Sequence, residues 1–372
     1  MKKHRVTAKD VAELAGVSQS TVSMILNSYK NINFSDETRV RVLDACDRLG
    51  YRTLGNSRLN SVMGRLLLVV YPTFHNALYL NMIDGIQQRA GELGYSVLTV
   101  CTERKEEQEA DIVRICREFQ VAGVLLVYQP DNISAVQLLS MEVPLVQLYD
   151  KSATMGVNTM ELDNYKIGQL IAEHLISLGH RYIAHISKPL TKTQSARSRR
   201  IEGLRSCMWE HGLDPDEYLH ISTVETEHLE NAENLEGYET GHLLVSHLLD
   251  IGAPVTAFAA TNDMMAYGVM DAILERGKKI PQDYSVCGCD NLSYSAFQRI
   301  ALTTVEPYTR QKALDSVDLL IGKIRTRNSS DREDSPVSIT RIEYAPRLIC
   351  RKSTARCSER YMEQDPAKNN KL

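Results

Sequence analysis

The sequence has no apolar run that approaches the roughly eighteen residues needed to cross a bilayer, and its N-terminus is charged where a secretory signal would be apolar. Its eight cysteines are scattered without the paired spacing of a zinc site or of a secreted disulfide framework. We therefore expect a cytoplasmic protein with reduced thiols, without a membrane partner and without a metal site.

Motifs that carry enzymatic chemistry are also missing. The sequence has no Gly-x-Ser-x-Gly, no His-Glu-x-x-His, no P-loop and no Gly-x-Gly-x-x-Gly that follows a strand. We expect no catalytic residue and no cofactor. With 372 residues, 43% hydrophobic and 24% charged, the chain has the composition of a globular protein with two or three folded units.

The N-terminal segment instead carries the pattern of a helix-turn-helix. Thr7 and Asp10 have the spacing of a capping box that begins one helix, and Gly16 ends it. The apolar face of this helix comprises Val11, Leu14 and Ala15. Ser18 is placed to cap a second helix, whose inward residues are Val22, Ile25 and Leu26. The outward face of this second helix carries mostly hydroxyl and amide groups, which suit contact with a DNA groove. Its residues are Gln19, Ser20, Ser23 and Met24.

Charge is distributed unevenly along the chain. Residues 1–65 hold 11 Lys and Arg against 6 Asp and Glu, a formal charge of +5, while the whole chain carries −4. The remainder is therefore close to −9. A basic head on an acidic body is the distribution expected of a domain that contacts DNA phosphates.

After the head, apolar strand-like runs alternate with amphipathic helical segments. The runs cover residues 66–70, 97–100, 124–128, 144–148, 182–186, 255–260 and 285–288. This alternation predicts an α/β fold with parallel sheets. The strands fall into two groups, which predicts two doubly wound lobes with a ligand cleft between them, because open parallel sheets bind ligands beyond the carboxyl ends of their strands. Cys287 and Cys289 would share one face of the last run and pack in the core.

Further motifs accompany the helix-turn-helix along most of the chain. They are Asp163-Asn164, Gly168, Leu178-Gly179-His180, Arg200-Ile201-Glu202-Gly203, Asn262-Asp263, Asp290-Asn291, Leu302-Thr303-Thr304 and Leu348-Ile349-Cys350-Arg351-Lys352-Ser353. Together with the head, this set resembles the lactose repressor (LacI/GalR) family of bacterial transcription regulators.

The resemblance implies a small all-α head and two lobes similar to periplasmic sugar-binding proteins. The expected divisions are a helix-turn-helix domain over 1–52, an atypical hinge or linker over 53–65, an effector-binding and dimerisation core over 66–354 and a flexible tail over 355–372. Chain crossings near Gly179, Glu306 and Tyr344 would divide the core. They give a first lobe of 66–178 and 306–344, and a second of 179–305 and 345–354. The tail lacks a leucine heptad, so we expect a homodimer.

In the resembled family the second helix reads bases in the major groove, which assigns base contacts to Gln19, Ser20 and Met24. Phosphate contact, or simple helix capping as an equally supported alternative, is expected of Thr7, Ser18, Thr21, Ser23 and Asn27. The family's minor-groove hinge has a leucine where this chain has Asn60. Arg58 and Leu59 are therefore the candidates for contact there.

The residues at effector-binding positions of the family are Leu78, Tyr79, Tyr149, Asp163, Arg200, Asn262 and Asp290. Carboxylates and amides bind sugar hydroxyls, and arginine supplies a planar fork for hydroxyl or acidic oxygens. Asp163 equally fits a helix N-cap, since Asn164 follows it. His180 and His185 lack metal-site spacing, and we expect structural roles for both.

These observations predict a sequence-specific transcription regulator, by preference a repressor. It would bind a palindromic double-stranded DNA operator as a homodimer and respond to a small-molecule effector, which the resemblance implies is a sugar or a related metabolite. The alternative is a cytoplasmic sugar-binding protein or a sugar-acting enzyme that uses the same cleft.

Overall fold

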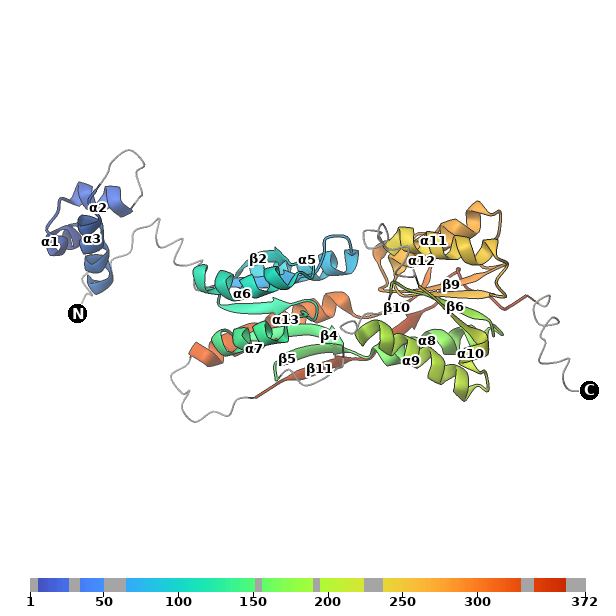
Figure 1. Cartoon of the computed structure of the whole chain (residues 1–372). Coiled ribbons are helices and arrows are strands. Elements are labelled where there is room, and N and C mark those ends of the chain that lie inside the picture. The colour runs from blue at the N-terminus through green and yellow to red at the C-terminus, as the bar shows by residue number, and fades with distance from the viewer. Residues whose placement is uncertain are drawn as a thin grey trace, which may run out of the picture.

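The computed structural model describes residues 6–26, 34–49, 65–150, 156–189, 195–223, 237–328 and 338–358. Figure 1 shows a small helical head and two larger lobes, each with a sheet that has helices on both of its faces. Within the described ranges, no helix combines the length and the apolar character that a membrane span requires. The α/β class with two lobes is confirmed.

The head packs three helices, α1 (Ala8–Ala15), α2 (Gln19–Leu26) and α3 (Asp36–Leu49). The expected capping box is present at the start of α1, where Thr7 Oγ1 donates to Asp10 Oδ2 at 2.7 Å. Gly16 ends α1 with a φ of 67°, a conformation that glycine adopts without strain. The shared core comprises Val11, Ala12, Ala15, Val22, Ile25, Val42, Ala45 and Cys46.

Leu14 departs from the apolar face expected for α1. Its side chain is 45% exposed, whereas Ala12 is buried in the head core. Helix α1 packs on both α2 and α3, so its buried stripe is centred on Val11, Ala12 and Ala15. The assignment of Leu14 to the inward face is therefore wrong.

The first lobe contains a parallel sheet in the order β11-β5-β4-β3-β1-β2. Its strands are β1 (Leu66–Tyr71), β2 (Ser96–Cys101), β3 (Gly123–Leu126), β4 (Leu145–Asp150), β5 (Asn158–Leu162) and β11 (Arg341–Tyr344). Its helices are α5 (Ala77–Glu92), α6 (Glu106–Glu118), α7 (Ile133–Glu142) and α13 (Thr309–Asn328). Leu67 and Val69 pack in one core with α5 and α13, while Leu68 and Val70 pack on the other face with α6 and α7. Both faces of the sheet are thus covered, as its continuous apolar runs require.

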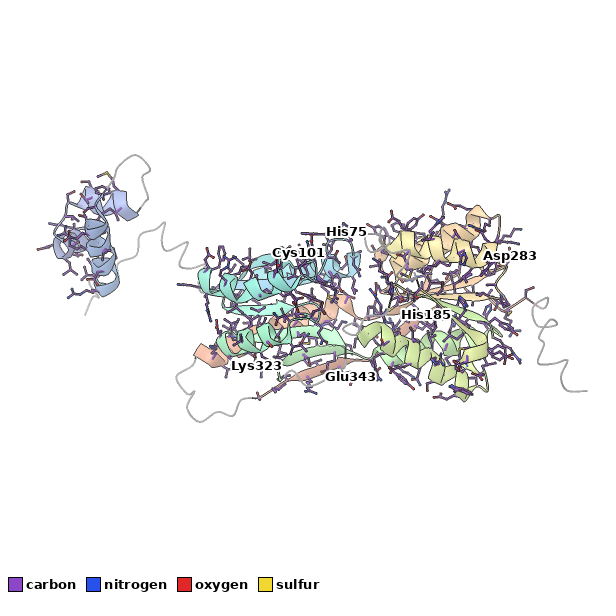
Figure 2. All side chains as sticks on the ribbon, in the orientation of Figure 1. His75, Cys101, His185, Asp283, Lys323 and Glu343 are labelled. Carbon is purple, nitrogen blue, oxygen red and sulfur yellow. The ribbon has the colours of Figure 1, made fainter. Side chains whose placement is uncertain are left out.

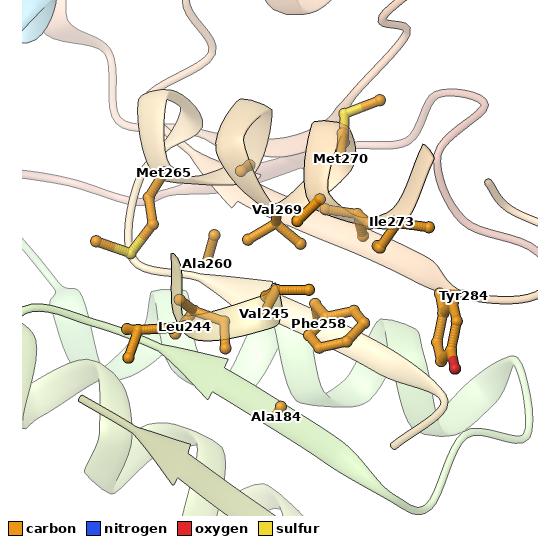
Figure 3. Packing of buried hydrophobic residues seen from close by; sticks show 14 of the residues in the cluster. Ala184, Leu244, Val245, Phe258, Ala260, Met265, Val269, Met270, Ile273 and Tyr284 are labelled. Atoms are coloured by element: carbon orange, nitrogen blue, oxygen red, sulfur yellow. The ribbon is translucent and has the colours of Figure 1, made fainter. Parts of the chain in front are cut away.

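The second lobe repeats this arrangement in the order β12-β10-β9-β8-β6-β7, with β12 antiparallel to β10. Its strands are β6 (Ile183–Ile186), β7 (Leu219–Ser222), β8 (Ala257–Ala260), β9 (Ser285–Cys289), β10 (Thr303–Glu306) and β12 (Arg347–Ile349). Its helices are α8 (Asn164–Ser177), α9 (Ser195–Glu210), α10 (Pro215–Tyr218), α11 (Gly237–Asp250), α12 (Asp263–Glu275) and the short η2 (Ser293–Ala296). Figure 3 shows Phe258 of β8 in the core between Val245, Ile273 and Tyr284. Cys287 and Cys289 are buried together against α8 and α9, which confirms their expected core role.

Glycines allow the helices that flank the second sheet to approach closely. A Cβ atom on Gly168 of α8 would lie 2.0 Å from the carbonyl oxygen of Arg200, and one on Gly203 of α9 would lie 2.0 Å from that of Tyr165. No side chain fits such a gap, so both glycines are required by the contact. This contact brings Arg200 to the N-terminal end of α8.

The chain passes between the lobes three times, after Leu162, after Glu306 and after Tyr344. The first crossing lies well before Gly179, where the sequence placed it. Helix α8 packs mainly on α9 and contributes Ile167, Ile171 and Leu175 to a core of the second lobe. The motif at Gly179 is the turn from α8 into β6, and it lies within the second lobe.

The beginning of the predicted flexible tail is packed. The Cys357 backbone N–H donates to the carbonyl oxygen of Leu178 at 2.8 Å, and the Cys357 side chain is buried. His180 Nε2 lies 3.1 Å from the carbonyl oxygen of Ala355 and 2.9 Å from Ser285 Oγ. Residues 355–358 therefore close the far end of the second lobe, and the prediction that this part of the tail does not pack is wrong.

Candidate DNA-binding and effector-binding sites

The N-terminal end of α2 is organised by Ser18. Its Oγ accepts a hydrogen bond from the Thr21 backbone N–H at 3.1 Å, as expected of an N-cap. The same hydroxyl lies 2.7 Å from Ser20 Oγ and 2.8 Å from Thr21 Oγ1. Because the Thr7 hydroxyl is likewise bonded to Asp10, the capping alternative describes both Thr7 and Ser18. Capping orients the helices and still leaves hydroxyl oxygens able to accept from or donate to a phosphate.

The outward face of α2 is polar and accessible. Gln19, Ser20 and Ser23 are exposed, and Met24 is half-buried. The exposed Gln19 amide carries both a donor and an acceptor, the pair of groups that a bidentate contact to adenine requires. Three other expected DNA contacts, Asn27, Arg58 and Leu59, lie outside the described residues.

Asp163 and Asn262 begin equivalent helices of the second lobe. The Asp163 carboxylate accepts from the Lys166 backbone N–H at 2.9 Å at the start of α8, and the Asn262 amide oxygen accepts from Met265 N at 2.8 Å at the start of α12. Both side chains are therefore helix N-caps, the alternative weighed for Asp163. A cap of this kind retains a second oxygen or an amide nitrogen for a ligand.

Arg200 connects these two helix starts. Its Nε donates to Asn164 Oδ1 at 2.7 Å, and its Nη1 donates to the carbonyl oxygen of Thr261, the residue before Asn262. Three nitrogen-bound hydrogens of the guanidinium take no part in these two bonds. Arg200 is thus held in place by the second lobe and can bind a further acceptor.

Asp290 forms a buried charged cluster with Asp263 and with Lys312, which the sequence did not single out. Asp290 follows β9 with a positive φ of 126°, a strained conformation for a non-glycine residue. Lys312 is buried although it belongs to α13 of the first lobe, and its electrostatic neighbours Asp290 and Arg200 are in the second. Asp263 accepts hydrogen bonds from Leu292 N, Ser295 Oγ and Thr304 Oγ1. The cluster therefore spans the boundary between the lobes.

Burial shifts the protonation of this cluster. It raises the pKa of Asp290 to about 8, with a further contribution from nearby Asp263. It lowers the pKa of Lys312 to about 8, against the opposing effect of Asp290. Both groups lose hydration and gain incomplete compensation from their partners. A charged or hydrogen-bonding ligand at this boundary would supply part of the missing compensation.

Arginines gather beside the cluster from both lobes. Arg197 of α9 has its pKa lowered to about 10 by burial, with the positive charges of Arg104 and Arg200 adding to the effect and Tyr79 opposing it. Arg104, in the loop after β2, has its guanidinium carbon 5.0 Å from the centre of the Tyr128 ring. Within the described ranges no carboxylate forms an ion pair with any of the three arginines. The expected contact Tyr79 is therefore close to a region of positive charge.

Three buried polar atoms have no hydrogen-bond partner within the described part of the chain. They are His185 Nδ1, Asp131 Oδ1 and Thr309 Oγ1. Figure 2 shows His185 in the second lobe at the end that faces the first. Burial, followed by Arg200 and Arg197, lowers the pKa of His185 to about 4, so its ring is neutral at physiological pH. Unsatisfied buried groups are rare and often await a ligand or water.

Of the remaining effector candidates, Leu78 and Tyr79 lie in the first turn of α5, where both are half-buried. Asn76 caps this helix by accepting from Leu78 N at 2.9 Å. The Tyr149 side chain lies outside the described residues. Lys312, Arg104 and Arg197 were missed by the sequence analysis because no periodic signal within their own segments marks them.

Comparison with known proteins gives matches over both parts of the chain. The family described as bacterial regulatory proteins, lacI family, matches residues 7–53. A periplasmic binding protein-like domain matches residues 172–355. The head and much of the core thus have separate, specific counterparts.

Two similar relatives span nearly the whole chain. The HTH-type transcriptional regulator DegA of Bacillus subtilis (strain 168) is 29% identical over 356 residues, which cover 94% of this chain and 98% of DegA. The HTH-type transcriptional repressor PurR of Mannheimia succiniciproducens is 29% identical over 353 residues, 93% of this chain and 98% of PurR. Among solved structures, the Lac repressor dimer bound to operator and the anti-inducer ONPF has a TM-score of 0.65, with 27% identity over 95% of this chain and 100% of that one.

Proposed function

Because this chain belongs to the LacI family of bacterial regulatory proteins, we propose that it is a transcriptional repressor whose operator affinity is controlled by a small metabolite held between its two lobes. It acts in the bacterial cytoplasm as a homodimer, and each head binds one half of a palindromic operator. The observation that carries this proposal is the combination of an exposed polar recognition helix with a buried charged cluster shared by two lobes.

Gln19, Ser20 and Met24 read base edges, while Thr7, Ser18, Thr21, Ser23 and Asn27 position the head on phosphates. Gln19 makes the most informative contact, since a bidentate amide distinguishes adenine from other bases by about 1–3 kcal/mol. The exposed Lys9 on α1 supplies charge without base preference.

Sequencing of genomic fragments captured by the purified full-length chain at near-physiological salt tests this assignment. Wild type should enrich one palindrome. Gln19→Ala should relax the preference at one position of each half-site, and Lys9→Ala should weaken binding to all sequences alike. Equal loss on every sequence for Gln19→Ala would remove Gln19 from the base contacts.

The effector site is formed by Arg200, Asp290, Asn262 and Asp163 from the second lobe and by Leu78 and Tyr79 from the first. Arg104, Arg197 and Lys312 join it. Three arginines without a carboxylate partner in the described part of the chain favour an effector that combines sugar hydroxyls with an acidic group, such as a sugar acid or a sugar phosphate. Asp163 and Asn262 accept from or donate to its hydroxyls.

Calorimetric titration with matched pairs of neutral sugars, sugar acids and sugar phosphates tests the effector class. An acidic member should bind at least about tenfold more tightly than its neutral counterpart, because a charged hydrogen bond contributes about 1.5–3 kcal/mol. Preference for the neutral sugar would contradict the acidic effector class without contradicting the residues assigned to the site. Recovery of every added sugar unchanged after prolonged incubation is expected of a regulator without enzymatic turnover.

Effector binding acts on DNA through the relative position of the lobes. Lys312 of the first lobe shares its environment with Asp290 and Arg200 of the second, so a ligand that neutralises this cluster changes the free energy of one lobe arrangement relative to another. Each arrangement holds the two heads of a dimer at a different separation, and this separation sets the affinity for the operator.

A further inference from the structure

A cluster of three metal-binding side chains lies in the second lobe, apart from both sites described above. Glu173 belongs to α8, Cys207 belongs to α9, and His211 directly follows the last residue of α9. One ligand atom from each residue lies within 4.8 Å of the other two. A thiol, an imidazole and a carboxylate are the three side-chain ligands that zinc uses in proteins.

Two of the three separations match those around a tetrahedral zinc ion. Cys207 Sγ lies 3.6 Å from Glu173 Oε2, and His211 Nε2 lies 3.4 Å from the same oxygen. With zinc bonds of about 2.0–2.1 Å to nitrogen or oxygen and about 2.3 Å to sulfur, ligand atoms of a tetrahedral site stand about 3.3–3.5 Å apart. The Glu173 oxygen is therefore already at the distance from both partners that a zinc site requires, and the ligand atoms of Cys207 and His211 lie within 4.8 Å of each other.

The His211 ring is oriented for ligation. Its Nδ1 donates to the carbonyl oxygen of Cys207 at 2.8 Å. In a neutral imidazole this bond leaves the lone pair on Nε2, the nitrogen that faces Glu173. Metal-binding histidines are characteristically fixed in this way, with the second ring nitrogen donating to a backbone carbonyl or a carboxylate.

The site is closed by protein on one side and open to solvent on the other. Cys207 is buried in the core between α8 and α9, whereas the Glu173 and His211 side chains are 60% and 35% exposed. We propose that Glu173, Cys207 and His211 bind one zinc ion, with a water molecule as the fourth ligand. The thiol proton is released to solvent when the Zn–S bond forms, since the thiolate is the ligand.

Such an ion would join α8 to α9 close to the effector site. Both helices carry effector-site residues at their N-terminal ends, where Arg200 Nε donates to Asn164 Oδ1, while Glu173 and Cys207 lie further along the same helices. Zinc would stabilise the helix pair that positions Arg200. The sequence alone did not indicate the site because its ligands come from two segments, and only Cys207 and His211 show a regular spacing.

Metal titration of the full-length chain, prepared without a polyhistidine tag and freed of metal by a chelator, tests the proposal. Zinc chloride should bind with one equivalent at this site, and cobalt chloride should produce a thiolate-to-cobalt charge-transfer band. Glu173→Gln and His211→Gln should each weaken zinc binding at least about tenfold, and Cys207→Ser should abolish the band. Cys350→Ser is the matched control, because Cys350 is an exposed thiol 3.8 Å from His174 Nδ1 and should be replaceable without loss.

Absence of zinc binding by wild type would overturn the proposal, as would a charge-transfer band that survives in Cys207→Ser or disappears in Cys350→Ser. Cys207 is buried, so its replacement can impair folding. The exposed variants then decide the question. Zinc affinity that is unchanged in both Glu173→Gln and His211→Gln excludes the site.

Discussion

The polar face of α2 and the charged region between the two lobes differ in where their hydrogen-bond partners lie. Ser18, Ser20 and Thr21 are at most half-buried and bond to one another within three residues of sequence. Arg200 instead bonds to Asn164 and Thr261, which are 36 and 61 residues away. The first set is assembled by one helix start, and the second requires a folded lobe.

This difference determines how strongly each region lowers the stability of the folded protein. Exposed side chains on α2 keep their hydration, so base-contacting residues are exchangeable without a large loss of stability. Asp290 and Lys312 are buried ionisable groups whose charged forms are incompletely compensated, so ionisation of either group destabilises the lobe boundary. Under the proposed function, the region between the lobes binds the effector and the head binds DNA.

The largest expected effect is on the helix contact that supports Arg200. Gly168→Ala places a Cβ 2.0 Å from the Arg200 carbonyl oxygen and should lower the free energy of unfolding of the second lobe by about 3 kcal/mol. Urea unfolding followed by the fluorescence of Trp209, which is in α9, measures it. Gly322→Ala in α13 meets nothing within 4 Å and should stabilise by about 0.5–1 kcal/mol. Equal stabilities for the two variants would contradict the close contact.

Next is the effect of Arg200→Ala on ligand response. Loss of a charged donor should weaken effector binding by about tenfold to a hundredfold, while operator binding without effector stays within about twofold of wild type. Calorimetry and operator titration measure the two quantities. Arg205→Ala on the same helix, whose ion pair with Asp216 is at the surface, should change neither. A normal effector response in Arg200→Ala would remove this arginine from the site.

A smaller effect is expected on the pH dependence of stability, through the buried carboxyl group of Asp290. Burial raises the pKa of Asp290 to about 8, so its ionisation penalises the folded state increasingly as pH rises from its unfolded value toward pH 8. Asp290→Asn removes that penalty. The stability of the variant relative to wild type should therefore rise by at least about 1.4 kcal/mol between pH 5 and pH 8, the equivalent of one pKa unit.

Urea unfolding at both pH values measures this difference. Burial lowers the pKa of His180 and of His185 to about 4, so their protonation destabilises the fold as pH falls below about 6.5. That effect is present in both proteins and cancels in the comparison. A relative stability that does not change between pH 5 and pH 8 would show that Asp290 is ionised in the native state throughout this range.

The smallest effect is expected in the head. Ser18→Ala removes the cap of α2 and should cost about 1 kcal/mol, whereas Ser18→Asn keeps a capping oxygen and should cost little. Hydrogen exchange of the α2 amides in the full-length chain measures the loss as an increase of about fivefold in rate. Faster exchange confined to the lobes would show that the cap does not stabilise α2.

The local rules of the sequence predicted the head and the apolar strands correctly. Capping boxes and glycine turns involve residues within four positions of one another, so the roles of Thr7, Asp10 and Gly16 can be predicted without tertiary context. Strands with continuous apolar runs, such as β1 and β8, were identified for the same reason. Strands β5 and β10 were missed because their residues include Asn158, Thr303 and Thr304, whose burial depends on neighbouring strands.

Other features could not be predicted from the sequence because they depend on contacts between residues that are far apart in the chain. The lobe to which α8 belongs is decided by its glycine contact with α9, and the roles of Lys312 and Arg197 depend on charges brought from distant segments. No period or motif within one segment contains that information. The candidate effector residues were instead located through the family resemblance, which encodes the folded arrangement.

The most direct test of the coupling between head and lobes is reciprocity. The affinity of the full-length chain for the acidic sugar that binds it is measured with and without saturating operator DNA, alongside the operator affinity with and without that sugar. Two coupled sites must change each other's affinity by the same factor, and we expect a factor of about 5–150. An effector affinity that is identical in the presence and absence of operator would contradict the account.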